Sequence, residues 1–136
     1  MPHIHNRKLI ARIWLYVTFC LITAAHYFFY RFSMDPLNTF AITRGLTFGC
    51  TLWTTVFLVA VWLRRGWARY ILITLICGTI GGFAFCAMLL ASQSVDPLPL
   101  QMRRVVAGLV LYSLALVPLG GSRSLRRYLE PRTAGE

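Results

Sequence analysis

Apolar residues in this chain are gathered into four long runs, and most of the charged residues lie outside the runs, in the short stretches between them and in the two terminal segments. The runs cover residues 13–30, 45–63, 70–91 and 103–119. Each is close to the ~20 residues that a helix needs to cross a bilayer. The last run borrows length from residues 98–102, and Arg103 and Arg104 extend toward the headgroups. The pattern predicts an all-α integral membrane protein, with four transmembrane helices in two antiparallel hairpins.

A short basic turn, Arg64-Arg65-Gly66-Trp67-Ala68-Arg69-Tyr70, separates the second run from the third. Arginines beside such turns tend to stay on the cytoplasmic side, and tryptophan prefers the membrane interface. We therefore expect Arg64, Arg65, Trp67 and Arg69 to be membrane-interface anchors, with the arginines near anionic headgroups. Gly66 is expected to end the second helix as its C-cap.

Two Asp-Pro pairs, Asp35-Pro36 and Asp96-Pro97, stand where the second and fourth helices are expected to begin. Aspartate at the N-cap followed by proline is a strong helix start. From Pro36 the helix can extend to Arg65, roughly 45 Å at 1.5 Å per residue, so its first turns should stand clear of the hydrocarbon core. The flanking residues of the two pairs are also alike, which fits either an internal duplication or two independent helix starts.

The basic residues indicate that both termini are cytoplasmic. In that orientation the cytoplasmic side holds ten of them: Arg7, Lys8, Arg12, Arg64, Arg65, Arg69, Arg123, Arg126, Arg127 and Arg132. The opposite side holds Arg31, Arg44, Arg103 and Arg104. The sequence thus divides into a basic head (1–12), a four-span bundle (13–121) and a basic tail (122–136). The tail has Leu125, Tyr128 and Leu129 on one helical face and is expected to lie at the membrane surface as far as Pro131.

Composition supports a membrane protein. Hydrophobic residues make up 57% of the chain and charged residues only 13%, against roughly 25% in soluble domains. The net charge of +10 lies beside membrane edges and does not indicate nucleic acid. The N-terminal run is too long for a signal peptide and is interpreted as the first span. All four cysteines lie in apolar runs and are expected to act as small hydrophobes.

The acidic residues are confined to Asp35, Asp96, Glu130 and Glu136, all outside the spans. Proton-coupled transport usually relies on carboxylates within the bilayer, and small multidrug exporters, which also have four short spans, depend on one. The chain departs from that pattern. No nucleophile–base–acid set is evident either, so we predict a protein that is not an enzyme.

His26 is the only candidate for a cofactor ligand, to haem or a quinone. A bis-histidine haem needs a second histidine, but His3 and His5 lie at the opposite end of the same span. His26 is also near the aromatic cluster of residues 27–30, so packing at the membrane interface is favoured. No cofactor and no metal site are predicted.

Small residues provide the positive signal for helix contact. Gly78 and Gly82 form a Gly-x-x-x-Gly pair with Cys86 further along the same face, and Gly45 and Gly49 form another. Such faces allow helices to approach closely. They fit packing inside the bundle, self-association or docking onto a partner. Nearby hydroxyls are expected to add interhelical hydrogen bonds: Thr47, Thr51, Thr54 and Thr55.

These observations favour a non-enzymatic inner-membrane protein, bacterial in type, that acts through helix–helix contacts. It could be an accessory subunit of a membrane complex or the immunity partner of a membrane-targeting toxin. In size and topology the chain is similar to four-span immunity proteins, which implies a protective role. The alternative is a small oligomeric channel or transporter. The expected partners are anionic lipids and either a membrane protein or a second copy, and not nucleic acid.

Overall fold

The computed structural model describes residues 3–34, 41–93 and 100–129. It contains five helices: α1 (His3–Ser33), α2 (Ala41–Trp62), α3 (Gly66–Gln93), α4 (Leu100–Gly121) and α5 (Arg123–Leu129). Four are long and apolar enough to cross a membrane, over Lys8–Ser33, Ala41–Trp62, Gly66–Leu89 and Met102–Gly121. The all-helical class and the four long apolar helices predicted from the sequence are confirmed, and they indicate an integral membrane protein.

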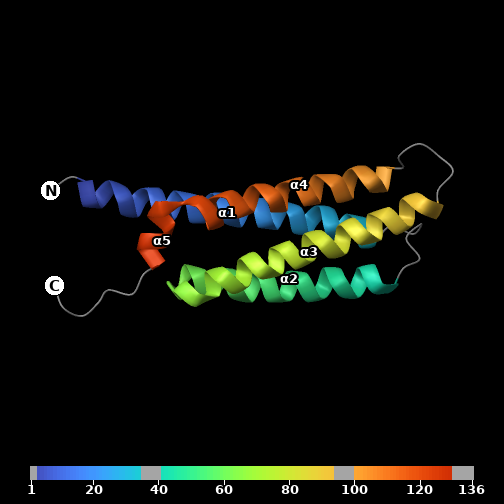
Figure 1. The fold of residues 1–136 in the computed structure, drawn as a ribbon, viewed down its shortest axis with the longest axis horizontal. Helices are drawn as coiled ribbons and strands as arrows, with labels where there is room; N and C mark the ends of the chain where they lie inside the picture. The colour runs from blue at the N-terminus through green and yellow to red at the C-terminus, as the bar shows by residue number, and fades with distance from the viewer. Residues whose placement is uncertain (1–2, 35–40, 94–99, 130–136) are drawn as a thin grey trace.

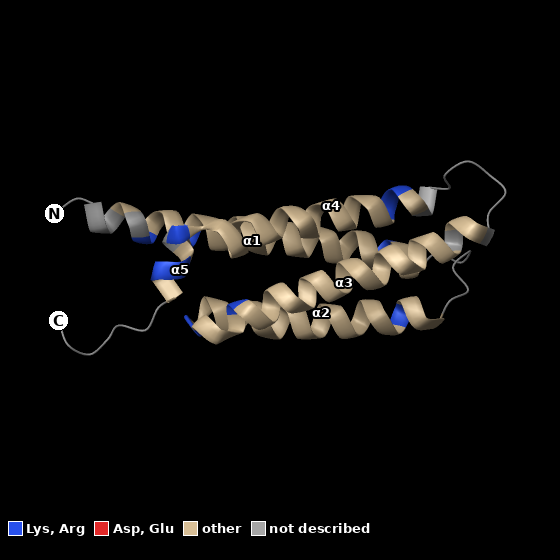
Figure 2. Ribbon diagram, in the orientation of Figure 1, with Lys and Arg blue, Asp and Glu red and all other residues tan. Residues whose placement is uncertain are grey.

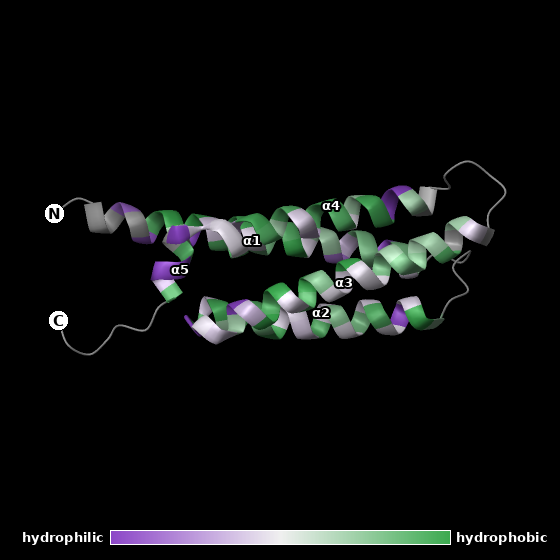
Figure 3. Ribbon diagram, viewed as in Figure 1, coloured by the Kyte–Doolittle hydropathy of each residue, from purple (hydrophilic) through white to green (hydrophobic). Residues whose placement is uncertain are grey.

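Large apolar side chains cover the outside of the bundle. Leu52, Phe85 and Val117 are each more than 60% exposed. In water an apolar surface of this extent would favour aggregation or docking, whereas lipid solvates it. In Figure 3 the hydrophobic residues extend along the four long helices, and the hydrophilic colour is strongest toward the ends. Helices suit this environment because their backbone hydrogen bonds are satisfied internally.

The four long helices pack in two closely associated pairs, α1 with α4 and α2 with α3. Figure 1 shows one pair along each side of the bundle, with α5 crossing the end where α1 begins and where α2 turns into α3. The α1–α2 contact is weaker than either of these, although the two helices are consecutive in the chain. The closest pairing therefore differs from the two expected hairpins. The first long helix, α1, packs most closely against the last long helix, α4, and not against its neighbour in the sequence.

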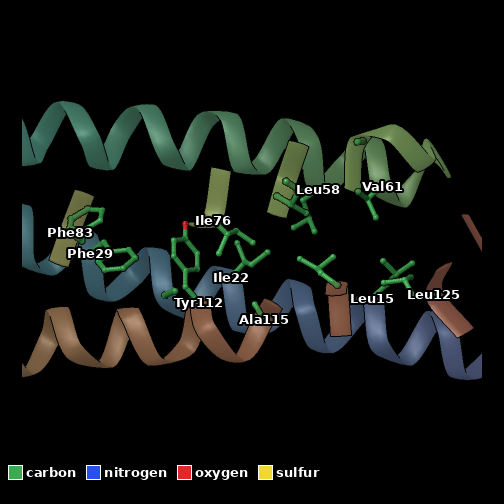
Figure 4. Packing of buried hydrophobic residues seen from close by; sticks show 14 of the residues in the cluster. Leu15, Ile22, Phe29, Leu58, Val61, Ile76, Phe83, Tyr112, Ala115 and Leu125 are labelled. Carbon is green, nitrogen blue, oxygen red and sulfur yellow. The ribbon is translucent and has the colours of Figure 1, made fainter. Parts of the chain in front are cut away.

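Interlocking aromatic and aliphatic side chains fill the space between the two pairs (Figure 4). The rings of Phe29 on α1 and Phe83 on α3 are stacked with centroids 4.0 Å apart. Tyr112 on α4 meets the Phe29 ring edge-on at 5.2 Å. At the other end of the core, Leu125 of α5 packs against the bundle and is fully buried. The core therefore joins all five helices.

Two helix boundaries differ from the expected ones. α1 begins at His3, so most of the expected basic head is part of a 31-residue helix. α2 ends at Trp62, before the expected limit at Arg65. The helix starts expected at Asp35-Pro36 and Asp96-Pro97 lie outside the described residues.

Candidate functional site

The glycines expected to form a contact face divide into two groups. A Cβ added at Gly82 on α3 would lie 3.1 Å from the Leu46 side chain of α2, so this glycine is used inside the bundle. Cys86, one helical turn further along, is also buried. Gly78 differs, because it is exposed and a Cβ there would meet nothing within 4 Å. The Gly-x-x-x-Gly pair therefore does not form one internal interface.

Gly45 and Gly49 on α2 likewise have open space around the position of a Cβ. So does Gly81 on α3, which the sequence pattern did not single out and which lies three residues beyond Gly78. Gly78, Gly81 and the exposed Cys77 share one face of α3, because residues three and four apart are neighbours on a helix surface. We call these three residues the outer α3 face.

Gly108 on α4 makes the closest approach of any glycine in the described structure. A Cβ at this position would lie 2.6 Å from the Phe29 ring of α1, closer than real Cβ contacts allow. The absent side chain thus lets α1 and α4 approach where the aromatic core is densest. The sequence search for glycine pairs missed this position because Gly108 is not part of a pair.

A polar cluster lies within the bundle, at His26 of α1, Thr54 of α2 and Tyr112 of α4. The His26 Nε2 atom is 2.9 Å from the Thr54 hydroxyl oxygen. That hydroxyl donates its one proton in a hydrogen bond to the Cys50 carbonyl, so its oxygen accepts a hydrogen bond from the Nε2–H of His26. The rings of His26 and Tyr112 meet edge-on at 5.6 Å. The sequence favoured an interfacial place for His26, but the structure turns its ring toward the other helices.

The other hydroxyls mostly bond within their own helices. Thr47 donates to the Thr43 carbonyl and Thr55 to the Thr51 carbonyl, each one turn back. Back-bonding of this kind satisfies a hydroxyl without a partner helix. Of the four threonines expected to bridge helices, Thr54 has the interhelical bond that the structure records. The Tyr112 hydroxyl is buried and has no hydrogen-bond partner among the described residues.

The end of α2 shows why Gly66 is not its C-cap. The Arg65 N–H bonds the Ala60 carbonyl and the Arg64 N–H bonds the Val61 carbonyl, which is the Schellman arrangement. The left-handed residue that this motif requires is Arg64, with φ of 63°. Gly66 instead begins α3. The reason for a glycine there is packing, since an added Cβ would lie 3.1 Å from the Leu129 carbonyl oxygen at the end of α5.

Arg69 is buried, whereas Arg64, Arg65 and Trp67, which the sequence also predicts as membrane-interface anchors, are exposed. Its guanidinium donates to the carbonyl oxygens of Leu119 and Gly120 in the last turn of α4. These carbonyls have no partner within the helix, and a cation there also opposes the negative end of the helix dipole. Arg69 is therefore a cap that ties α3 to α4, beyond the anchoring role expected from the sequence.

α5 docks onto the bundle through the face that the sequence predicted. Leu125 and Leu129 are buried, and the Ser122 hydroxyl accepts the Leu125 N–H as an N-cap. The Arg64 guanidinium lies 4.2 Å from the centre of the Tyr128 ring. Burial alone would raise the pKa of Tyr128, but the hydrogen bonds and charges of Arg64 and Arg12 together lower it.

Candidate cofactor ligands remain few. Among the described residues, no group of three histidine, cysteine or acidic side chains is placed to hold a metal ion. His26 is engaged by Thr54 and Tyr112, so haem ligation would require those contacts to break. The described cysteines are free thiols, at Cys20, Cys50, Cys77 and Cys86.

Comparisons of the chain with protein-family models, with curated proteins and with solved structures found no match.

Proposed function

We propose that this is a non-enzymatic integral membrane protein that acts through helix–helix contact with a membrane partner. The protein is an accessory subunit of a membrane complex or the immunity partner of a membrane-targeting toxin, and the setting is the bacterial inner membrane with both termini cytoplasmic. The observation that carries the proposal is the outer α3 face, Cys77, Gly78 and Gly81, which is exposed in the described part of the chain.

Exposed glycines in a helix need a reason. Each costs about 1 kcal/mol relative to alanine on helix-propensity scales measured in water, and a Cβ at Gly78 or Gly81 would meet nothing within 4 Å in the described structure. In lipid the hydrophobic effect does not hold helices together, so close backbone approach and dispersion are the main source of affinity. A second helix seated on this face would make use of both glycines.

The bundle also shows what a used glycine looks like. Gly82, next to Gly81, admits the Leu46 side chain, and Gly108 admits the Phe29 ring. The adjacent glycines Gly81 and Gly82 therefore differ in their surroundings: Gly82 faces Leu46 inside the bundle, and Gly81 faces outward. This gives a matched pair of variants for testing the proposal.

The test compares Gly81→Leu with Gly82→Leu in the full-length protein. Gly82→Leu should lower the thermal stability in detergent because the new side chain meets Leu46. Gly81→Leu should leave stability near that of the parent but abolish recovery of the partner when the tagged protein is crosslinked and purified from native membranes. Met88→Leu, at an exposed position on the same helix, is the control for placing a leucine on the lipid-facing surface.

Two results would count against contact as the function. Gly81→Leu could leave partner recovery unchanged, in which case the outer α3 face is only lipid-facing. Alternatively, reconstituted vesicles could show ion or solute flux that is lost in bundle variants, which would favour the channel or transporter. A stoichiometric partner without flux would support the proposal.

A further inference from the structure

The end of the bundle at α5 carries a dense positive charge. Of the basic side chains that the structure describes, eight lie there: Lys8, Arg12, Arg64, Arg65, Arg69, Arg123, Arg126 and Arg127. Four lie toward the opposite end: Arg31, Arg44, Arg103 and Arg104. Figure 2 shows basic residues on α5 and on the neighbouring parts of the bundle, and no acidic residue within the described ranges. Within the described ranges this end of the bundle thus contains basic residues and no acidic residue.

Two of these arginines converge on one phenol. Arg64, from the α2–α3 turn, places its guanidinium 4.2 Å from the centre of the Tyr128 ring. Arg12, from α1, acts on the same side chain, because the charges of Arg64 and Arg12 both lower the pKa of Tyr128. The two guanidinium groups repel each other, and the neutral phenol does not neutralise their charge. Such a pair is stabilised by an anion.

The three groups lie on three separate elements, α1, the α2–α3 turn and α5. Leu125 and Leu129 fix α5 against the bundle, and the Leu129 carbonyl lies where Gly66 leaves room for it. The backbone of Arg64 is constrained by the turn that ends α2. The position of Tyr128 beside Arg64 is thus a consequence of the fold and not of one mobile segment.

The position identifies the kind of anion. Tyr128 lies beside the ends of the apolar spans, and Trp67 is exposed at the same turn, where tryptophan marks the headgroup region. Arginine forks match the geometry of phosphate oxygens. We propose that Arg12, Arg64 and Tyr128 form a binding site for the phosphate of an anionic phospholipid. The two guanidiniums bind the phosphate oxygens, and the phenol hydroxyl donates a hydrogen bond to the phosphate.

This site goes beyond helix contact and does not depend on it, because the outer α3 face is not involved. It also differs from the general attraction of basic residues to a membrane, since it requires guanidinium groups at defined positions that can donate paired hydrogen bonds to one phosphate. Bound lipid would join α1, the α2–α3 turn and α5 and so hold α5 in its docked position.

The test measures binding of phosphatidylglycerol to the full-length protein in neutral detergent, by native mass spectrometry, with phosphatidylcholine as the uncharged comparison. The parent should retain phosphatidylglycerol in preference. Arg12→Gln and Arg64→Gln should each weaken it about fivefold, from ~1 kcal/mol per basic residue near an anionic surface. Arg103→Gln, at the opposite end, should leave binding unchanged.

Two further variants separate a built site from diffuse charge. Arg64→Lys keeps the charge but loses the fork, so a built site should lose affinity while diffuse attraction would not. Tyr128→Phe keeps the ring that Arg64 covers but loses the hydroxyl, and should weaken binding in a protein that still folds, as judged by circular dichroism and its elution profile.

Three results would overturn the proposal. Arg103→Gln could weaken binding as much as Arg12→Gln, which would show delocalised attraction. Inorganic phosphate alone could compete as effectively as the lipid, which would show a site for soluble anions. Finally, Glu130→Gln could destabilise the protein while phosphatidylglycerol adds nothing to the parent, which would show that a protein carboxylate supplies the counter-charge.

Discussion

The contact between Gly108 and Phe29 shows how much one missing side chain decides in this bundle. The Phe29 ring occupies the space that a Cβ at position 108 would need, and the same ring stacks on Phe83 and meets Tyr112. A change at position 108 should therefore disturb the packing of α1, α3 and α4. Close-packed protein interiors transmit such strain because they contain few voids.

We expect Gly108→Ala to destabilise the protein by about 1–3 kcal/mol, the usual range for overpacking a dense core. Unfolding in mixed detergent–SDS micelles would measure the change. Gly120→Ala is the control, because a Cβ there meets nothing within 4 Å, and it should be neutral or slightly stabilising. Adding Phe29→Leu to Gly108→Ala should restore part of the lost stability, because the smaller side chain leaves room for the new Cβ. If the two changes in unfolding free energy are simply additive, the contact between positions 29 and 108 is contradicted.

The Thr54–His26 hydrogen bond gives a second prediction at this scale. Thr54→Val removes the partner of Nε2 within the bundle and should cost about 0.6–1.7 kcal/mol, the range measured for hydrogen bonds between membrane helices. Thr55→Val is the matched control, since Thr55 is exposed and bonds only within its helix in the described structure. Equal effects of the two variants in the same unfolding assay would show that the interhelical bond contributes nothing.

Single residues were the part of the site least accessible from the sequence. Spacing identified Gly82 but could not show that Gly78 lies outside, because the two faces of α3 are equally apolar. Gly108 had no periodic signal, since its role depends on a ring from a distant helix. His26 was placed by its aromatic neighbours in the chain, whereas Thr54 from another helix determines where its ring points.

Three arginines complete the C-terminal ends of helices in this structure. Arg69 donates to the last turn of α4, and the Arg44 Nε atom lies 3.4 Å from the Ser33 carbonyl oxygen at the end of α1. Arg64 takes the left-handed conformation that closes α2. In each case a residue interpreted from the sequence as a charge at the membrane edge also completes a helix terminus.

Arg69→Ala should destabilise the α3–α4 contact by about 1–3 kcal/mol, because the carbonyls of Leu119 and Gly120 lose their donor. Arg69→Lys should recover only part of the loss, since an ammonium cannot reproduce the fork that reaches both oxygens. Arg65→Ala removes the same charge from an exposed neighbour and should be mild in the same unfolding assay. If Arg65→Ala and Arg69→Ala are equivalent, the cap is unimportant.

The sequence predicted the presence of the helices more accurately than the residues at which they begin and end. Hydropathy and length sufficed for the four long helices, because a bilayer demands a minimum apolar length. The amphipathic face of α5 was also visible in Leu125, Tyr128 and Leu129. The end of α2 was misplaced because glycine is the usual left-handed residue, and nothing local shows that Arg64 takes this conformation while Gly66 makes room for α5.

At the scale of the whole molecule, the four spans and their flanking charges lead to a prediction of orientation. The start of α1, the α2–α3 turn and α5 lie at one end of the bundle, and this end holds most of the described basic residues. The positive-inside rule then places this end in the cytoplasm. Which helices pair most closely was not readable from the sequence, because loop length does not determine contact between α1 and α4.

Reporter fusions check the orientation. A fusion after Glu136 should be active as a cytoplasmic reporter, and a fusion within residues 94–95 should be active as a periplasmic one. Replacing Arg64, Arg65 and Arg69 together by glutamine should make the orientation less uniform, because it removes three of the charges that hold the second turn inside. A periplasmic C-terminus in the parent would contradict the proposed topology.

The cap formed by Arg69 has a consequence for how the protein is made. Its acceptor at Leu119 is 50 residues further along the chain, so about 3–10 s of synthesis separate the two at 5–20 residues per second. Throughout that interval the guanidinium has no α4 to bind, and in the proposed orientation we expect it to stay hydrated at the cytoplasmic end of the α2–α3 hairpin. We expect the same group to leave water only when α4 packs beside it. Substitutions at position 69 should then affect biogenesis and stability as separate events.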